Sequence, residues 1–184
     1  PAVGVDQDVA GLQVAVDDEV AVGVGDRLAN LSEELEARAE IAASATASIG
    51  IISEPNAHPQ CSDELGRIPG PLVTAVLNGD VDNHADLVAA DDLAIPAEIT
   101  TDAKVIPSLI SRGLAAGSPP RESFCGAVDP LEGSVASGAA IAVAPDRLLL
   151  ALRGSGQALY VGLADDAFIV ASEPYGLVEE TSTY

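Results

Sequence analysis

Residues 71–79 read PLVTAVLNG, a run of apolar residues that ends in Asn78 and Gly79. Valine and leucine in so short a run are typical of a buried strand. Asn-Gly is the strongest two-residue signal for a β-hairpin, but residues 80–90 (DVDNHADLVAA) look like the start of a helix and offer no second strand. We therefore predict a strand that ends by bringing the Asn78 side chain and the Gly79 N–H to one point, an arrangement that suits an oxyanion hole.

The sequence before this strand alternates between extended and helical patterns. Residues 11–22 (GLQVAVDDEVAV) predict a hairpin with an acidic turn, and residues 26–39 predict an amphipathic helix. Residues 42–52 are small and apolar, as in a strand, whereas the proline-rich residues 53–70 predict a loop. Strands and one helix are thus expected ahead of the central strand.

After the central strand, helices come first and further strands follow. Three helices are predicted, over residues 83–90, 101–114 and 122–130. Thr101 or Asp102 is a suitable N-cap for the second of them. From Gly133 onward, four runs of β-forming residues are separated by turn residues at the spacing of a meander. This order predicts a single α+β domain over residues 1–184, with largely antiparallel sheets.

The composition is that of a globular and strongly acidic protein. Apolar residues make up 48% of the 184 residues, which is enough for one sizeable core. The formal charge of −21, from 29 acidic and 8 basic residues, argues against nucleic acid or an anionic membrane surface as a partner, because both would repel the chain. The sequence shows neither an apolar run of 18 residues nor a secretory leader, so we expect a soluble, cytoplasmic protein with no membrane segment.

Residues that could bind a metal do not form a convincing set. Cys61 and Cys125 do not combine with His58 or His84 into a metal-ligand spacing, so reduced thiols are expected. Residues 80–86 carry oxygen-bearing side chains at alternate positions, as calcium loops do, but the glycine that such a loop needs is absent. A solvated acidic helix start is therefore favoured, and no metal site is expected.

Two short loops also invite a chemical interpretation. Residues 56–59 (NAHP) form a proline-flanked loop with hydrogen-bonding side chains. Residues 154–156 (GSG) lie between two strand-like runs and predict a hairpin turn. Because the sequence contains no phosphate-binding motif and no nucleophile elbow, we expect neither a nucleotide cofactor nor a serine triad.

Several segments, taken in order, resemble a known family. They are residues 8–12 (DVAGL), 50–59 (GIISEPNAHP), 73–79 (VTAVLNG) with Asn83-His84, 100–102 (TTD), 132–134 (EGS), 149–153 (LLALR) and 168–172 (FIVAS). This series resembles the glutaminase domain, a type-2 glutamine amidotransferase domain, of glutamine–fructose-6-phosphate aminotransferase. The resemblance extends over nearly the whole chain, and the Asn-Ala-His-Pro and Leu-Asn-Gly stretches are its most specific parts.

The resemblance implies an N-terminal-nucleophile hydrolase-like fold, a four-layer αββα sandwich of two antiparallel sheets between helices. It also implies that an N-terminal cysteine attacks the side-chain amide of L-glutamine, and that the ammonia passes to a sugar-phosphate-binding domain of the same longer protein. Asn78 and Gly79 match the oxyanion-hole pair of the family. Asp102 matches an acid that holds the α-amino group of glutamine. L-Glutamine is thus the expected ligand, no cofactor is expected, and the chain could form a homo-oligomer.

The chain departs from the family pattern at two places. It opens with Pro1, where the family has its cysteine nucleophile, so whether this chain is an enzyme stays open. Ala45 and Thr46 stand where the family has an arginine, which pairs with the glutamine carboxylate, and a tryptophan. The main hypothesis is a glutaminase domain for amino-sugar phosphate synthesis, active or degenerate. The alternatives are a non-catalytic regulatory or interaction domain that keeps the fold, and a glutaminase of the asparagine synthetase or amidophosphoribosyltransferase kind.

Overall fold

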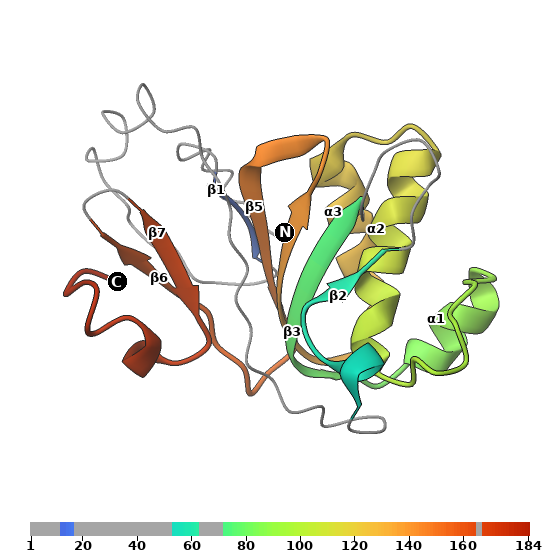
Figure 1. The fold of residues 1–184 in the computed structure, drawn as a ribbon, viewed down its shortest axis with the longest axis horizontal. Coiled ribbons are helices and arrows are strands. Elements are labelled where there is room, and N and C mark those ends of the chain that lie inside the picture. Colours follow the sequence, from blue (N-terminus) through green and yellow to red (C-terminus); the bar gives the residue numbers. More distant parts are fainter. Residues whose placement is uncertain (1–11, 17–52, 63–71, 165–166) are drawn as a thin grey trace, which may run out of the picture.

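A computed structural model describes residues 12–16, 53–62, 72–164 and 167–184 of the chain (Figure 1). The strands are β1 (Leu12–Val16), β2 (Gln60–Cys61), β3 (Val73–Val81), β4 (Gly133–Ile141), β5 (Ala144–Arg153), β6 (Tyr160–Leu163) and β7 (Phe168–Ala171). The α-helices are α1 (His84–Ala90), α2 (Val105–Ala115) and α3 (Pro120–Val128), and short 3₁₀ helices span Glu54–Asn56, Asp102–Lys104 and Pro174–Gly176.

Five strands form one sheet in the order β1-β5-β4-β3-β2. Strands β2 to β5 pair in antiparallel fashion, whereas β1 runs parallel to β5. Strands β6 and β7 form a separate antiparallel pair. The long pairing of β3 with β4 sets Asn78 opposite Ala136 and Gly79 opposite Val135, beyond the short pairing of β2 with Thr74 and Ala75.

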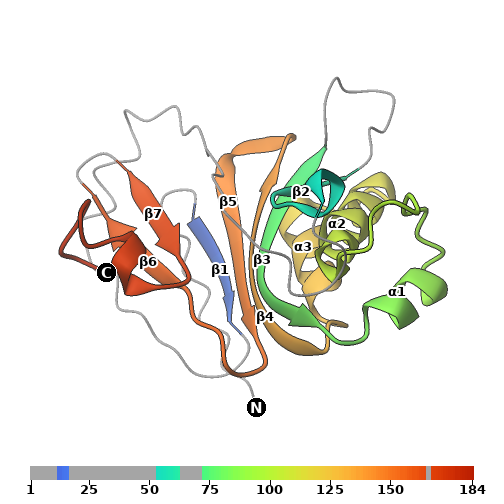
Figure 2. The ribbon, with the colours of Figure 1, turned by 60° about the horizontal axis from the view of Figure 1, so that its bottom comes forward.

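The elements are arranged in layers. Helices α2 and α3 lie on one side of the five-stranded sheet, and the β6–β7 pair lies on the other side (Figures 1 and 2). The hydrophobic core lies between the sheet and the helices, where α2 contributes Ile106 and Ile110 and α3 contributes Phe124, all almost fully buried. Burial of these apolar side chains is the main force that holds the helices on the sheet.

Alternation along β3 divides its side chains between the two faces of the sheet. Val73, Ala75, Leu77 and Val81 are buried in the core with the helices, whereas Asn78 is exposed. The Asn78 side chain therefore points away from α2 and α3, toward the face on which β6 and β7 lie.

Most elements predicted for the described residues are confirmed. Strand β1, the three helices and the four C-terminal strands lie where the sequence placed them, and the Thr101 side chain accepts a hydrogen bond from the Ala103 N–H at the start of the second helical segment. The central strand, however, does not end at Asn78-Gly79: it continues to Val81 because β4 pairs with it over its full length. The predicted elements within residues 17–52 and 63–71 lie outside the described residues.

The prediction of a hairpin turn at residues 154–156 is wrong. The strands on either side of it, β5 and β6, belong to different sheets, so the segment carries the chain from one sheet to the other. The even spacing of strand-like runs could not reveal this, because spacing does not specify which strands pair. Within the described residues, no helix has both the length and the hydropathy needed to cross a membrane.

Candidate functional site

Asn56 anchors the loop of residues 53–59 to the segment that begins at Thr100. The side chain is 1% exposed. Its Oδ1 accepts hydrogen bonds from the backbone N–H groups of Thr100 and Thr101, at 2.7 and 3.2 Å. Its Nδ2 donates to the hydroxyls of Ser53 and Thr100, at 3.0 and 3.1 Å. Two segments more than 40 residues apart are thus held together by one buried side chain.

The same loop brings His58 to strand β3. The His58 Nδ1 accepts a hydrogen bond from the Leu77 N–H at 3.4 Å, so the neutral ring carries its proton on Nε2. Burial lowers the pKa of His58 from its ordinary value of 6.5, and the negative charge of Asp102 opposes this effect. A proton on Nδ1 would also break the bond from Leu77, so the neutral ring fits this position.

Asp102 is buried against the same strand. It is 3% exposed, and its Oδ2 accepts a hydrogen bond of 2.6 Å from the Val81 N–H. The Thr101 hydroxyl donates to its Oδ1 at 3.4 Å. Asp102 itself lies in the 3₁₀ helix Asp102–Lys104, and its carboxylate contacts β3 at Val81, three positions beyond Asn78.

The hydrogen bonds of β3 show which way its backbone faces. In an antiparallel strand, the N–H groups of alternate residues point to the same edge. The Leu77 and Val81 N–H groups point away from β4, toward His58 and Asp102. Gly79 lies between these two residues in β3.

Gly79 has a backbone that other residues would adopt only at a cost. Its φ is +122°, and a Cβ at this position would overlap the carbonyl oxygen of Ser134 in β4. Only glycine fits this close approach of two strands without strain. Asn78 and Gly79 both lie within β3, so they do not form a hairpin turn. Glycine is needed at position 79 because β4 approaches it closely.

The neighbouring Asn78 side chain contacts a distant loop. Its Nδ2 donates a hydrogen bond of 2.7 Å to the Oε1 of Gln157, in the segment that connects β5 to β6. Of the three residues predicted for the site, Asn78 and Gly79 lie in β3, whereas Asp102 lies in a 3₁₀ helix and its carboxylate contacts the same strand at Val81. Sequence reasoning gave no role to His58 or Gln157, because only the tertiary structure brings them to this stretch.

Neither cysteine lies at this stretch of β3. Cys61 is in β2 opposite Thr74, and its Sγ lies 3.6 Å from the Thr74 hydroxyl. Four residues of extended strand separate Thr74 from Asn78, a distance of about 13 Å. Cys125 lies in α3, in the helical layer.

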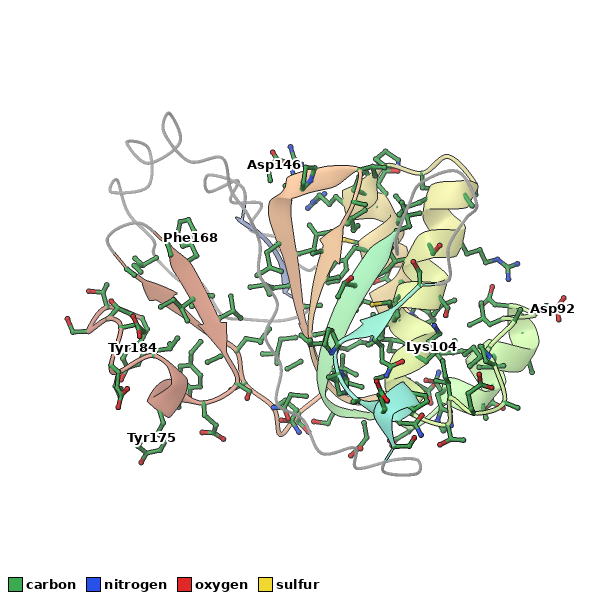
Figure 3. All side chains as sticks on the ribbon, in the orientation of Figure 1. Asp92, Lys104, Asp146, Phe168, Tyr175 and Tyr184 are labelled. Carbon is green, nitrogen blue, oxygen red and sulfur yellow. The ribbon has the colours of Figure 1, made fainter. Side chains whose placement is uncertain are left out.

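A buried lysine is also found near the β2 edge. Lys104 is 3% exposed, and its Nζ donates a hydrogen bond of 2.5 Å to the carbonyl of Cys61. Figure 3 labels this side chain near the foot of α2. Ala45 and Thr46, the positions at which the chain departs from the family pattern, lie outside the described residues.

Comparison with known proteins identifies the fold. The chain is similar to the Bacillus subtilis glutamine phosphoribosylpyrophosphate amidotransferase in complex with ADP and GMP, with a TM-score of 0.56 and 21% identity over 70% of this chain and 28% of that one. It is also similar to a structure described as the allosteric regulatory enzyme of purine biosynthesis, with a TM-score of 0.53 and 21% identity over 66% of this chain and 25% of that one. The chain has the N-terminal-nucleophile hydrolase fold of the glutamine amidotransferases. The fold predicted from the resemblance is therefore confirmed.

The sequence comparison gives the same picture. The chain is 32% identical over 137 residues to a glutamine–fructose-6-phosphate aminotransferase (isomerizing) of Mesorhizobium japonicum. The match covers 73% of this chain but 21% of that protein, so the chain spans about a fifth of the relative's length. The resemblance to the glutaminase domain of this family is confirmed. No family model matches the chain.

Proposed function

We propose that this chain is the glutaminase domain of a glucosamine-6-phosphate synthase-like aminotransferase and that it binds L-glutamine at the Asn78–Gly79 stretch of β3. The observation that carries the proposal is the arrangement along β3. The exposed carboxamide of Asn78, the neighbouring Gly79, and Val81, whose N–H donates to the buried carboxylate of Asp102, fall within four residues of this strand. The similarity to glutamine-dependent amidotransferases supports glutamine as the ligand.

Each polar group of this stretch suits one part of glutamine. The Asn78 Nδ2 and the Gly79 N–H would donate to the oxygen of the side-chain amide. When a nucleophile attacks that amide, the oxygen becomes negatively charged, and two fixed donors stabilise this charge. The carboxylate of Asp102 would attract the α-amino group, because a cation beside a carboxylate forms a charge-assisted hydrogen bond.

In this proposal the described residues would bind L-glutamine and stabilise the oxyanion, but they would not supply the nucleophile. A thiolate at this site would form a bond to the amide carbon. The C–N bond of the tetrahedral intermediate would then break, the protonated nitrogen would leave as ammonia, and water would hydrolyse the remaining thioester to glutamate. The two cysteines lie elsewhere in the structure, Cys61 beside Thr74 and Cys125 in α3. In the wider proposal, the ammonia would serve amino-sugar phosphate synthesis at a sugar-phosphate-binding domain of the same longer protein.

The test is titration of the 184-residue chain with L-glutamine. Calorimetry measures the affinity, and the backbone amide resonance of Gly79 reports whether the ligand binds at this stretch. Asp102→Asn is the informative variant, because an amide oxygen still accepts from the Val81 N–H while the negative charge is lost. We expect it to weaken L-glutamine binding about ten- to a hundredfold, as loss of a charged hydrogen bond does. Asp86→Asn, an exposed carboxylate on α1, is the matched control and should bind like the wild type.

One observation favours a second candidate function. The Asn78 donor is already engaged by Gln157 within the chain. A non-catalytic regulatory or interaction domain could use this contact to keep the fold without binding glutamine. If L-glutamine at millimolar concentration moves no resonance of the chain, the glutaminase proposal is wrong and this alternative replaces it.

A further inference from the structure

The contact between Asn78 and Gln157 joins positions 79 residues apart in the sequence. The acceptor in this bond is the oxygen of a primary carboxamide. A primary carboxamide is also the reactive group of glutamine, the ligand that the proposed function assigns to the same donor. Gln157 is partly buried, and its bond to Asn78 lies at the surface, where a ligand from solvent can reach it.

The loop that carries Gln157 is fixed against the start of β4. The Ser134 hydroxyl donates a hydrogen bond of 2.5 Å to the carbonyl of Ser155. Gly154 and Gly156 have φ values of +75° and +99°, and a Cβ on Gly154 would overlap the carbonyl oxygen of Gly133. These positive φ angles let the chain turn closely over β4.

Gln157 also lies over the second member of the pair. A Cβ placed on Gly79 would be 3.2 Å from the Cγ of Gln157. The stem of the Gln157 side chain therefore lies beside Gly79, while its amide oxygen contacts the Nδ2 of Asn78. One side chain thus occupies the space beside both residues of the proposed oxyanion pair.

We propose that Gln157 is an internal carboxamide ligand that occupies the amide position of the Asn78–Gly79 site, so that free glutamine must displace it. The identity of the displacing ligand rests on the proposed function. Because Gln157 is tethered, it competes at a high effective concentration. Gln157 competes through a single neutral hydrogen bond to Asn78, so we expect its presence to weaken L-glutamine binding about two- to tenfold.

Two substitutions at this position have opposite expected effects. Gln157→Ala removes the competing oxygen and should strengthen L-glutamine binding about two- to tenfold. Gln157→Glu keeps an acceptor at the same distance and gives it a negative charge, which strengthens its bond to the Asn78 amide. This variant should bind L-glutamine more weakly than the wild type. Asp146→Ala, at an exposed position in β5, should leave the affinity unchanged.

The experiment is calorimetric titration of the four proteins with L-glutamine, with the side-chain NH₂ resonances of Asn78 recorded before ligand is added. We expect those resonances to move in Gln157→Ala and not in Asp146→Ala. Unmoved resonances in Gln157→Ala would show that the bond is absent. Equal L-glutamine affinities in all four proteins would overturn the competition while leaving the glutamine site in place.

Two further outcomes would overturn the inference in different ways. Weaker binding by Gln157→Ala would mean that Gln157 orients Asn78 for the ligand rather than competing with it. Absence of L-glutamine binding in all four proteins would remove the proposed function, and the competition with it.

Discussion

Replacement of Gly79 by alanine tests the backbone geometry on which the candidate site depends. The φ of +122° is costly for a residue with a side chain, by about 1–3 kcal/mol. The new Cβ would also overlap the Ser134 carbonyl, which is fixed by the pairing of β3 with β4. The backbone shifts needed to relieve this overlap would lower the stability by about 1–3 kcal/mol more. We therefore expect Gly79→Ala to lower the free energy of unfolding by about 2–6 kcal/mol, a large part of the stability of a typical domain.

Urea denaturation followed by circular dichroism is the assay, with Gly126→Ala as the matched control. Gly126 lies in α3, and a Cβ there would meet no atom within 4 Å. In a helix, alanine is favoured over glycine by about 0.5–1 kcal/mol, so this variant should be slightly more stable than the wild type. Gly79→Ala should lower the urea midpoint by about 1–3 M. A Gly79→Ala protein as stable as the wild type would refute both the strained φ and the close approach of Ser134.

Three more outcomes are expected. Asn56→Ala should lower the free energy of unfolding by about 3–5 kcal/mol, because four hydrogen bonds are lost and the buried Thr101 N–H loses its partner. Asn56→Asp keeps the acceptor and should lose less stability in the same urea assay; equal losses in the two variants would count against this account. Because the pKa of His58 is below 6.5 in the folded chain, the unfolded chain binds more protons, and the free energy of unfolding should rise with pH from the folded pKa to just above 6.5. Urea denaturation between pH 5 and 8 should show a weaker rise in His58→Asn, and an unchanged rise would be evidence against this role of His58. In an enzyme-coupled assay, the purified 184-residue chain should release no ammonia from L-glutamine above background, because neither Cys61 nor Cys125 lies at the site. Sustained ammonia release that Asn78→Ala abolishes would contradict this prediction.

The local pattern of the sequence was sufficient for most of the described elements. The apolar run at residues 71–77 predicted β3, and the helix-like pattern of residues 83–90 predicted α1. Strand alternation, helical periodicity and capping residues are properties of neighbouring residues, so they can be read without knowing the fold. The family resemblance then supplied the layered architecture, which local pattern alone could not specify.

Pairing between strands was beyond the reach of the same signals. The sequence indicated that β3 would stop at Asn78-Gly79, but β4 extends the strand to Val81 by pairing along its whole length. The GSG segment of residues 154–156 has the composition of a hairpin turn, yet it leads from β5 into another sheet. A turn sequence describes how the chain bends, and the partner of the next strand depends on which surfaces remain to be buried.

For the candidate site, the sequence by itself determined the residue types and their order: the Asn-Gly pair after an apolar run and an acid at a helix start. Only the tertiary structure decided which groups meet, because hydrogen bonds join His58 to Leu77, Asp102 to Val81 and Gln157 to Asn78. These bonds span between 19 and 79 positions of the chain. Contacts over such separations depend on how distant segments pack against one another, so no local pattern in the sequence records them.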